Sequence, residues 1–153
     1  MRQYRITKYN PINRDISGAY LLDEWTEFSD VGKLTDIKEY EVVERQYIES
    51  LKLLLSDNQI TSLKLVGLED YQKLCPFKKT GSIPQHEFGN AFRSVLRSEY
   101  WCKFEAKHAY VHFGYDFYSY IGVPTASEYT IKRIEKKGLF IENCHSPFLD
   151  NGT

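Results

Sequence analysis

The chain has 153 residues, of which 42% are hydrophobic and 27% charged, a composition that excludes a disordered protein and predicts one folded domain over residues 1–153. Its formal net charge of −1 at pH 7 argues against a protein that coats nucleic acid. No apolar run approaches the ~18 residues of a membrane span, and no apolar signal core follows Met1, so we expect a cytoplasmic protein with no membrane partner.

Three widely spaced cysteines point to the same compartment. Cys75, Cys102 and Cys144 are odd in number, so we expect reduced thiols and not a disulfide framework. They are too far apart for a zinc knuckle, and no other cluster has the ligand spacing of a metal site, so we expect neither metal nor cofactor. Asn151-Gly152-Thr153 spells a glycosylation sequon, which has no consequence in a protein that is not exported.

The first 35 residues predict a strand followed by a long loop. Residues 2–9 alternate apolar and polar side chains, as a half-buried strand does. Turn signals fill residues 10–35, which predict a structured loop with a short strand at 19–22. We expect Trp25 and Phe28 to pin this loop to the core.

A long amphipathic helix comes next. Asp36 and Glu39 have the spacing of a capping box, in which each side chain bonds a backbone amide of the first turn. Apolar residues then recur at three- and four-residue steps as far as residues 57–58, which predicts a helix of about five turns. Residues 60–66 predict a strand that ends at Gly67.

A second helix is predicted to start at Ser82 or its neighbour, with Pro84 tolerated in its first turn. Arg93 and Arg97 lie on its polar side. Its buried side is formed by five apolar residues, namely Phe88, Ala91, Phe92, Val95 and Leu96.

Residues 101–121 alternate between two faces of a strand pair. A turn near 106–108 predicts a hairpin in which 101–105 pair with 109–113. One face should lie in the core. The other, wetter face should carry the polar and tyrosine side chains His108, Tyr110, His112, Asp116, Tyr118 and Tyr120.

The last elements are a short helix and a strand. Thr125 and Glu128 form a second capping box, and the helix that follows should stop at Gly138. Residues 139–144 predict the last strand, and Pro147 should end the ordered chain. Helices do not alternate regularly with single strands, so we predict an α+β fold: one domain whose antiparallel or mixed sheet has about three helices packed on one face.

The acidic residues are concentrated in one part of the chain. Residues 15–58 hold eleven acids against four bases, which implies a local negative field that speeds encounter with a basic partner. We predict a protein-binding surface with Trp25 as its apolar anchor. Its predicted members are Asp23, Glu24, Trp25, Glu27, Asp30, Glu39 and Glu44.

The His- and Tyr-rich residues 108–120 leave two alternatives open. His108 and His112 could serve a small metal-independent nuclease as an acid–base pair, although positions i and i+4 of a strand lie ~13 Å apart. The exposed tyrosines could instead stack on single-stranded RNA. Neither alternative matches a defined catalytic or RNA-binding motif.

Several segments also resemble a known group of proteins. They are Arg5-Ile6-Thr7-Lys8-Tyr9-Asn10-Pro11, Asp23-Glu24-Trp25-Thr26, Ser29-Asp30-Val31-Gly32, residues 83–89, residues 111–116 and residues 138–142. These resemble small bacterial immunity proteins of contact-dependent growth inhibition and related polymorphic toxin systems. The resemblance implies a stoichiometric inhibitor, not an enzyme, that neutralises one cognate toxin domain, expected to be a nuclease, in the cytoplasm. It assigns no binding residue and leaves the oligomeric state open.

Overall fold

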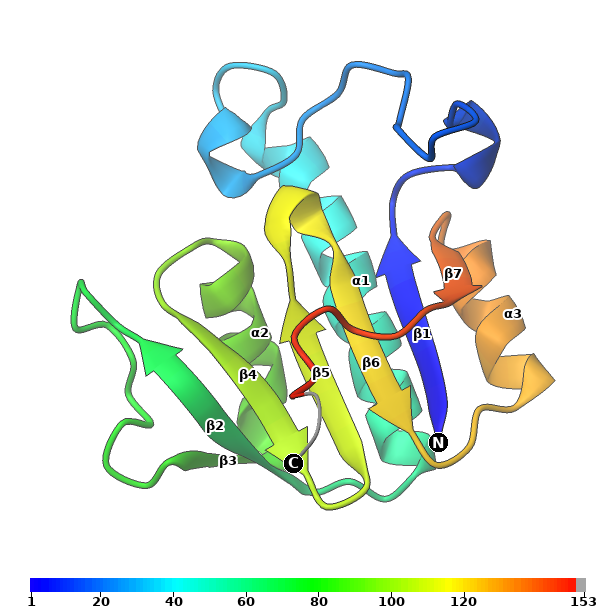
Figure 1. The fold of residues 1–153 in the computed structure, drawn as a ribbon. Coiled ribbons are helices and arrows are strands. Elements are labelled where there is room, and N and C mark those ends of the chain that lie inside the picture. Colours follow the sequence, from blue (N-terminus) through cyan, green and yellow to red (C-terminus); the bar gives the residue numbers. More distant parts are fainter. Residues whose placement is uncertain (151–153) are drawn as a thin grey trace.

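One antiparallel sheet organises the chain in the computed structural model, which describes residues 1–150 (Figure 1). The sequon at residues 151–153 lies outside them. The described strands pair in the order β3-β2-β4-β5-β6-β1-β7, and every neighbouring pair is antiparallel. Their bounds are β1 Arg2–Thr7, β2 Ser62–Glu69, β3 Ser82–Pro84, β4 Trp101–Ala106, β5 Ala109–Phe113, β6 Ser119–Val123 and β7 Phe140–Asn143.

Three helices cover one face of this sheet, as Figure 1 shows. They are α1 Ile37–Asp57, α2 Phe88–Leu96 and α3 Glu128–Lys136. Single 3₁₀ turns lie at Pro11–Asn13, Phe28–Asp30, Gln85–Glu87 and Tyr115–Phe117. The predicted α+β class, with about three helices and an antiparallel sheet, is confirmed. None of the helices in residues 1–150 combines the length and apolar character needed to cross a bilayer.

Helix α1 forms where its periodic apolar residues predict it. The Asp36 carboxylate accepts a hydrogen bond from the Glu39 amide at 2.8 Å, which satisfies an otherwise unpaired donor of the first turn. The Glu39 side chain does not complete the capping box; it accepts from the Thr35 hydroxyl at 2.9 Å. The buried stripe includes Tyr40, Tyr47, Leu51, Leu54 and Leu55, all fully buried against the sheet.

Two predictions in the first half of the chain are wrong. Residues 19–22 form no strand, because the loop folds on itself with only an isolated bridge between Arg14 and Tyr20. Strand β2 does not stop at Gly67. It continues through Gly67 to Glu69, and its register against β4 shifts between Val66 and Glu69. Gly67 has a φ of +66°, a backbone conformation that residues with a side chain rarely adopt.

The predicted start of the second helix is also wrong. Residues 82–84 form edge strand β3, in which Ile83 pairs with Leu63 of β2, and α2 begins only at Phe88. Pro84 is tolerated in this edge strand because the backbone N–H that proline lacks is not needed for pairing at this position. The predicted buried side of α2 is confirmed, since all five of its apolar residues are buried. Helix α3 is capped by Ser127, two residues after the predicted cap.

The hairpin of β4 and β5 is confirmed, with Phe104 opposite Val111 and Ala106 opposite Ala109. The predicted wetter face of these strands is wrong, because Tyr110, His112 and Tyr120 are all buried. Residues 144–150 cross the helix-free face of the sheet and cover part of it (Figure 1). We call this segment the C-terminal strap. Order therefore continues past Pro147, contrary to prediction.

Polar and aromatic contacts hold the strap on the sheet. The Ser146 hydroxyl lies 2.7 Å from Nδ1 of His112, and the ammonium of Lys103 donates to the Phe148 carbonyl at 3.2 Å. The Phe148 ring packs against Trp101 and Tyr120, with centroids 5.4 and 6.3 Å apart. The strap thus completes a small second core on the face that lacks helices.

Replacing Phe148 by Ala is expected to lower the free energy of unfolding by about 2 kcal/mol, because the ring is half-buried between β4 and β6. Pro147→Ala, at an exposed position of the same strap, is the matched control and should change stability little. Urea unfolding measures both. Equal losses in the two variants would contradict the strap's role as a packed element.

Candidate functional site

Residues 10–41 form one end of the molecule, at the top of Figure 1, and we call them the crown. The crown comprises the loop between β1 and α1 and the first turn of α1. It holds eight acids against three bases. Most of the predicted acidic surface therefore lies in one region and is not scattered over the molecule.

Three of the predicted partner-binding residues are exposed in the crown: Asp23, Glu27 and Glu39. Two others have internal partners. Glu24 accepts hydrogen bonds from the Lys8 ammonium and from the Tyr20 hydroxyl. Asp30 accepts from the backbone amides of Thr26 and Glu27, at 2.8 and 3.3 Å, and so fixes the turn that presents Glu27.

The remaining two predicted members, Trp25 and Glu44, do not reach the surface. Trp25 is 5% exposed and packs edge-to-face against Phe117, so its predicted role as an exposed anchor is wrong. Glu44 is 3% exposed and accepts two hydrogen bonds, both 2.9 Å, from the guanidinium of Arg97. This bidentate pair ties α1 to the end of α2 and neutralises the carboxylate.

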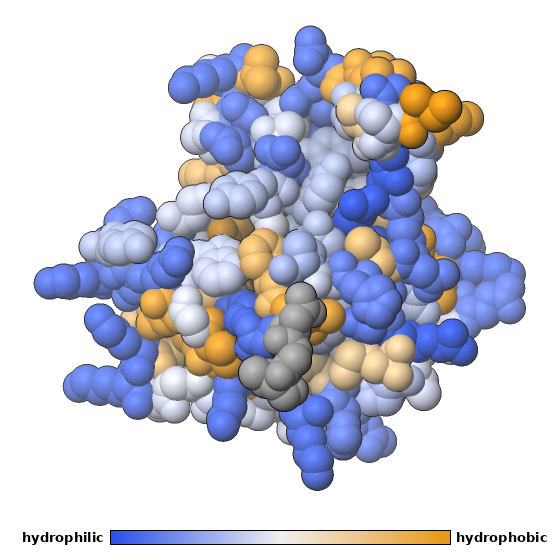
Figure 2. All heavy atoms as spheres, in the orientation of Figure 1, coloured by the Kyte–Doolittle hydropathy of each residue, from blue (hydrophilic) through white to orange (hydrophobic). Residues whose placement is uncertain are grey.

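The structure reveals apolar crown residues that the sequence analysis missed. They follow one another in the loop around the Arg14–Tyr20 bridge, and Figure 2 shows hydrophobic residues gathered over that loop at the upper right. Ile12 is 81% exposed, Ile16 is fully exposed, and Leu21 and Leu22 are more than half exposed. We call these four residues the apolar patch. No periodicity marks them, because the loop is neither helix nor strand.

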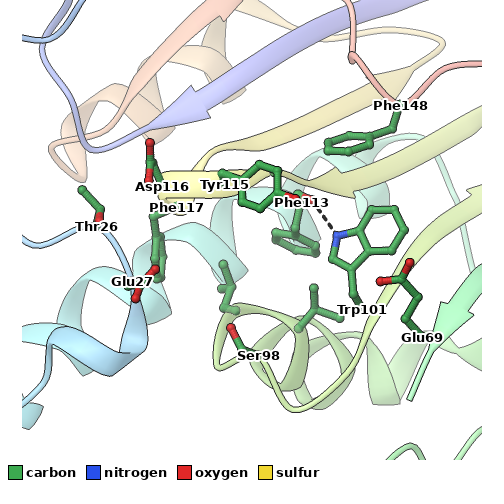
Figure 3. A pocket seen from close by; sticks show the side chains of 13 residues that line it. Thr26, Glu27, Glu69, Ser98, Trp101, Phe113, Tyr115, Asp116, Phe117 and Phe148 are labelled. Atoms are coloured by element: carbon green, nitrogen blue, oxygen red, sulfur yellow. Dashed lines mark hydrogen bonds between the residues drawn. The ribbon is translucent and has the colours of Figure 1, made fainter. Parts of the chain in front are cut away.

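A pocket of about 390 Å³ lies beside the crown, between the ends of the central strands (Figure 3). Its apolar floor and walls come from the end of α2 and from rings on β4, β5, the β5–β6 turn and the strap. Glu27 belongs to the crown and also lines the pocket. Its lining is Thr26, Glu27, Glu69, Val95, Leu96, Ser98, Trp101, Phe113, Gly114, Tyr115, Asp116, Phe117 and Phe148.

The turn between β5 and β6 shapes this pocket. Asp116 and Phe117 both have left-handed backbone conformations, with φ of 59° and 63°, which is unusual for an aromatic residue. The turn directs Phe117 into the core and leaves Tyr115 88% exposed at the pocket. The indole N–H of Trp101 donates to the Phe113 carbonyl at 2.9 Å and so holds the opposite wall in place.

The pocket is acidic. Glu27, Glu69 and Asp116 line it, and its lining contains no Lys, Arg or His. The nearby bases are engaged elsewhere: Arg97 is paired with Glu44, and Lys103 with the strap. Residues 1–150 show no group of three or more His, Cys, Asp or Glu arranged to hold a metal ion, so the three carboxylates are not a metal cluster.

The His- and Tyr-rich strand offers a poor site for either alternative function. His108 lies in the β4–β5 turn, whereas His112 is fully buried under the strap. Burial, with a further contribution from the charge of Lys103, lowers the pKa of His112 to about 4, so the ring is neutral at pH 7. Tyr110 and Tyr120 are covered by the same strap and present no stacking platform.

The two buried cysteines offer no reactive nucleophile. Cys75, Cys102 and Cys144 are free thiols, as predicted. Burial raises the pKa of the Cys75 and Cys102 thiols, which keeps them protonated and unreactive.

No protein-family model, curated protein or solved structure matches the chain. The function must therefore be argued from the crown, the apolar patch and the pocket themselves.

Replacing His112 by Asn is expected to flatten the dependence of stability on pH. Because the pKa of His112 falls from 6.5 in the unfolded chain to about 4 in the folded one, only the unfolded state binds a proton between these values. The free energy of unfolding should be highest above pH 6.5, decline between pH 6.5 and about 4, and level off below pH 4. Between pH 7 and 5, the free energy of unfolding of the variant should fall by about 2 kcal/mol less than that of the native protein. Urea unfolding at both pH values measures this difference.

His108→Asn, in the exposed turn, is the control and should keep the native slope. If His112→Asn lost as much stability between pH 7 and 5 as the native protein, the buried ring would not be the source of the acid sensitivity.

Proposed function

We propose that this protein binds a cognate bacterial toxin domain and neutralises it, as immunity proteins do, by placing its crown against the toxin's basic active site. The observation that carries the proposal is the juxtaposition in the crown of exposed carboxylates and an exposed apolar patch. The toxin would be a nuclease, because enzymes that bind a phosphate backbone present basic clefts.

The exposed carboxylates supply the attraction. Asp23, Glu39 and Glu41 are exposed, and residues 1–150 show no salt bridge to any of them, so their charge acts on an approaching partner. A local field of this kind raises the association rate with a basic protein and is screened by salt.

The apolar patch supplies lasting contact. Apolar surface removed from water contributes roughly 25 cal/mol per Å², so burial of four Ile and Leu side chains would slow dissociation substantially. Isolated apolar side chains are common on protein surfaces, but a group confined to one projecting loop marks an interaction site. The patch, and not Trp25, supplies the apolar contact with the partner in this proposal, because Trp25 is buried in the core.

Inhibition by occlusion requires no chemistry from this protein. The buried neutral His112, the protonated thiols and the internally paired Glu44 and Lys8 all have structural roles in the fold. These observations support a binding protein over a nuclease that uses the strand at 108–120.

Reversing Asp23, Glu39 and Glu41 to Lys is expected to slow association with the toxin domain on the order of tenfold at low salt, with less effect at high salt. The partner to use is an inactivated toxin domain encoded beside this gene, and stopped-flow kinetics gives the rate. The control triple Glu49→Lys, Glu128→Lys and Glu135→Lys changes net charge equally at exposed positions outside the crown. Equal slowing by both triples would place the contact outside the crown, and failure of the native protein to bind or neutralise the toxin would overturn the proposal.

Replacing Ile16 and Leu21 together by Ala is expected to raise the dissociation rate of the complex about tenfold while leaving association nearly unchanged. Tyr71→Ala with Leu74→Ala is the matched control, because these side chains are also exposed but lie in the β2–β3 loop. Surface plasmon resonance separates the two rate constants. An unchanged dissociation rate in the crown variant would remove the patch from the interface.

A further inference from the structure

We propose that the pocket beside the crown receives a basic side chain, preferentially an arginine, from the same toxin partner. The inference rests on the proposed function for the identity of the partner, and on the pocket alone for the chemistry that it recognises. Thr26 and Glu27 belong to both the crown and the pocket, so one partner surface can contact the two together.

The pocket combines aromatic walls with carboxylates. In Figure 3 the rings of Tyr115, Phe148 and Trp101 surround it, and Glu69 and Glu27 lie on opposite sides. Aromatic faces attract cations, with Trp the strongest, and the attraction grows where water is excluded. A carboxylate at the edge of such a pocket adds a charge-assisted hydrogen bond. Together these groups select a cation.

Nothing in residues 1–150 neutralises these carboxylates. The side chains of Glu69 and Asp116 have no hydrogen-bond or salt-bridge partner in that part of the chain. Glu27 accepts from the Ser29 hydroxyl and, in a capping box, from the Asp30 amide, and neither donor carries a charge. The bases nearest in sequence to the lining are Arg93 and Arg97, which pair with Glu44, and Lys103, which is held by the strap. The negative charge of the pocket is therefore available to a ligand.

The same chain builds two filled sites of this composition. Lys8 lies 4.2 Å from the centre of the Trp25 ring and 4.4 Å from that of Tyr9, and it donates to Glu24. Arg97 lies 4.9 Å from the Phe28 ring centre and pairs with Glu44. In each, a cation, an aromatic ring and a carboxylate come together. The pocket holds the ring and carboxylate components of that arrangement, with no base of its own.

Arginine suits the pocket better than lysine. Its planar guanidinium stacks on aromatic rings, bonds a carboxylate through two N–H groups and is more weakly hydrated than an ammonium. Its apolar stem can pack on Val95, Leu96 and Phe113 along the floor. The volume of about 390 Å³ accommodates one such side chain with part of its backbone.

The first test is NMR titration with acetyl-arginine amide, with acetyl-citrulline amide as its uncharged analogue. The arginine probe should shift the Trp101 indole N–H signal, assigned with a Trp101→Phe variant, with a dissociation constant on the order of 1–10 mM. Glu27→Gln with Glu69→Gln should weaken binding on the order of tenfold. The control pair Glu128→Gln with Glu135→Gln, exposed on α3, should leave it unchanged. Equal shifts with citrulline, or binding unaffected by the pocket variants, would overturn the inference.

The same titration distinguishes a protein side chain from a free polyamine, which would share the cationic chemistry. If spermidine bound tenfold more tightly than the arginine probe, a small-molecule polyamine would be the occupant and the proposed protein contact would be wrong.

The second test uses the toxin complex. Glu69→Gln and Tyr115→Ala lie outside the crown, and each should speed dissociation about tenfold. If the toxin binds the native protein and both variants equally, the pocket inference fails while the proposed function stands. If the arginine probe binds but the toxin is neither bound nor neutralised, the proposed function fails, and with it the assignment of the occupant to the toxin.

Discussion

The position of Phe117 is the constraint on which the rest of the structure depends. Its left-handed backbone conformation costs on the order of 1–3 kcal/mol for a residue with a side chain. Its ring packs edge-to-face on Trp25, Tyr40 and Tyr47, with centroids 5.1, 5.7 and 4.7 Å apart. Such contacts contribute about 0.5–1.5 kcal/mol each beyond burial, enough together to offset the strain. One side chain thereby joins the crown, helix α1 and the β5–β6 turn, and the same turn places Tyr115 and Asp116 at the pocket.

Internal ion pairs decide which charges the surface presents. The sequence shows an excess of acids but not which of them are neutralised. Arg97 reaches Glu44 from the end of α2, and Lys8 reaches Glu24 from the end of β1. Removing both arginines that pair with the buried Glu44, Arg97 and Arg93, would leave its charge without a partner, so these residues belong to the framework. The proposed binding surface consists of the acids that remain unpaired, together with exposed apolar side chains of a loop.

The parts of the fold that sequence alone predicts are those with a repeating pattern. Helix α1, the buried side of α2 and the β4–β5 hairpin follow from periodicity, because each buries one face whatever lies elsewhere. The strap could not be predicted in this way, since residues 144–150 have no period and their partners, His112 and Trp101, lie more than thirty positions away. The pocket depends on the same long-range packing. Of its three carboxylates, the sequence predicts only Glu27 as a partner-binding residue, because charge counting detects the acids of the crown but does not show that Glu69 and Asp116 lie near them.

The crown is a long loop, yet its backbone is held by many local hydrogen bonds. The Asp15 carboxylate accepts from the amides of Ser17 and Ala19, and Asn10 accepts from Ile12, so the loop that carries the apolar patch is closed by its own turns. Trp25 and Phe28 attach the following stretch to the core. A loop ordered before binding loses little further conformational entropy when a partner docks. The contacts of the patch could then contribute to affinity directly, which is the property that the proposed inhibitor needs to hold a target without covalent chemistry.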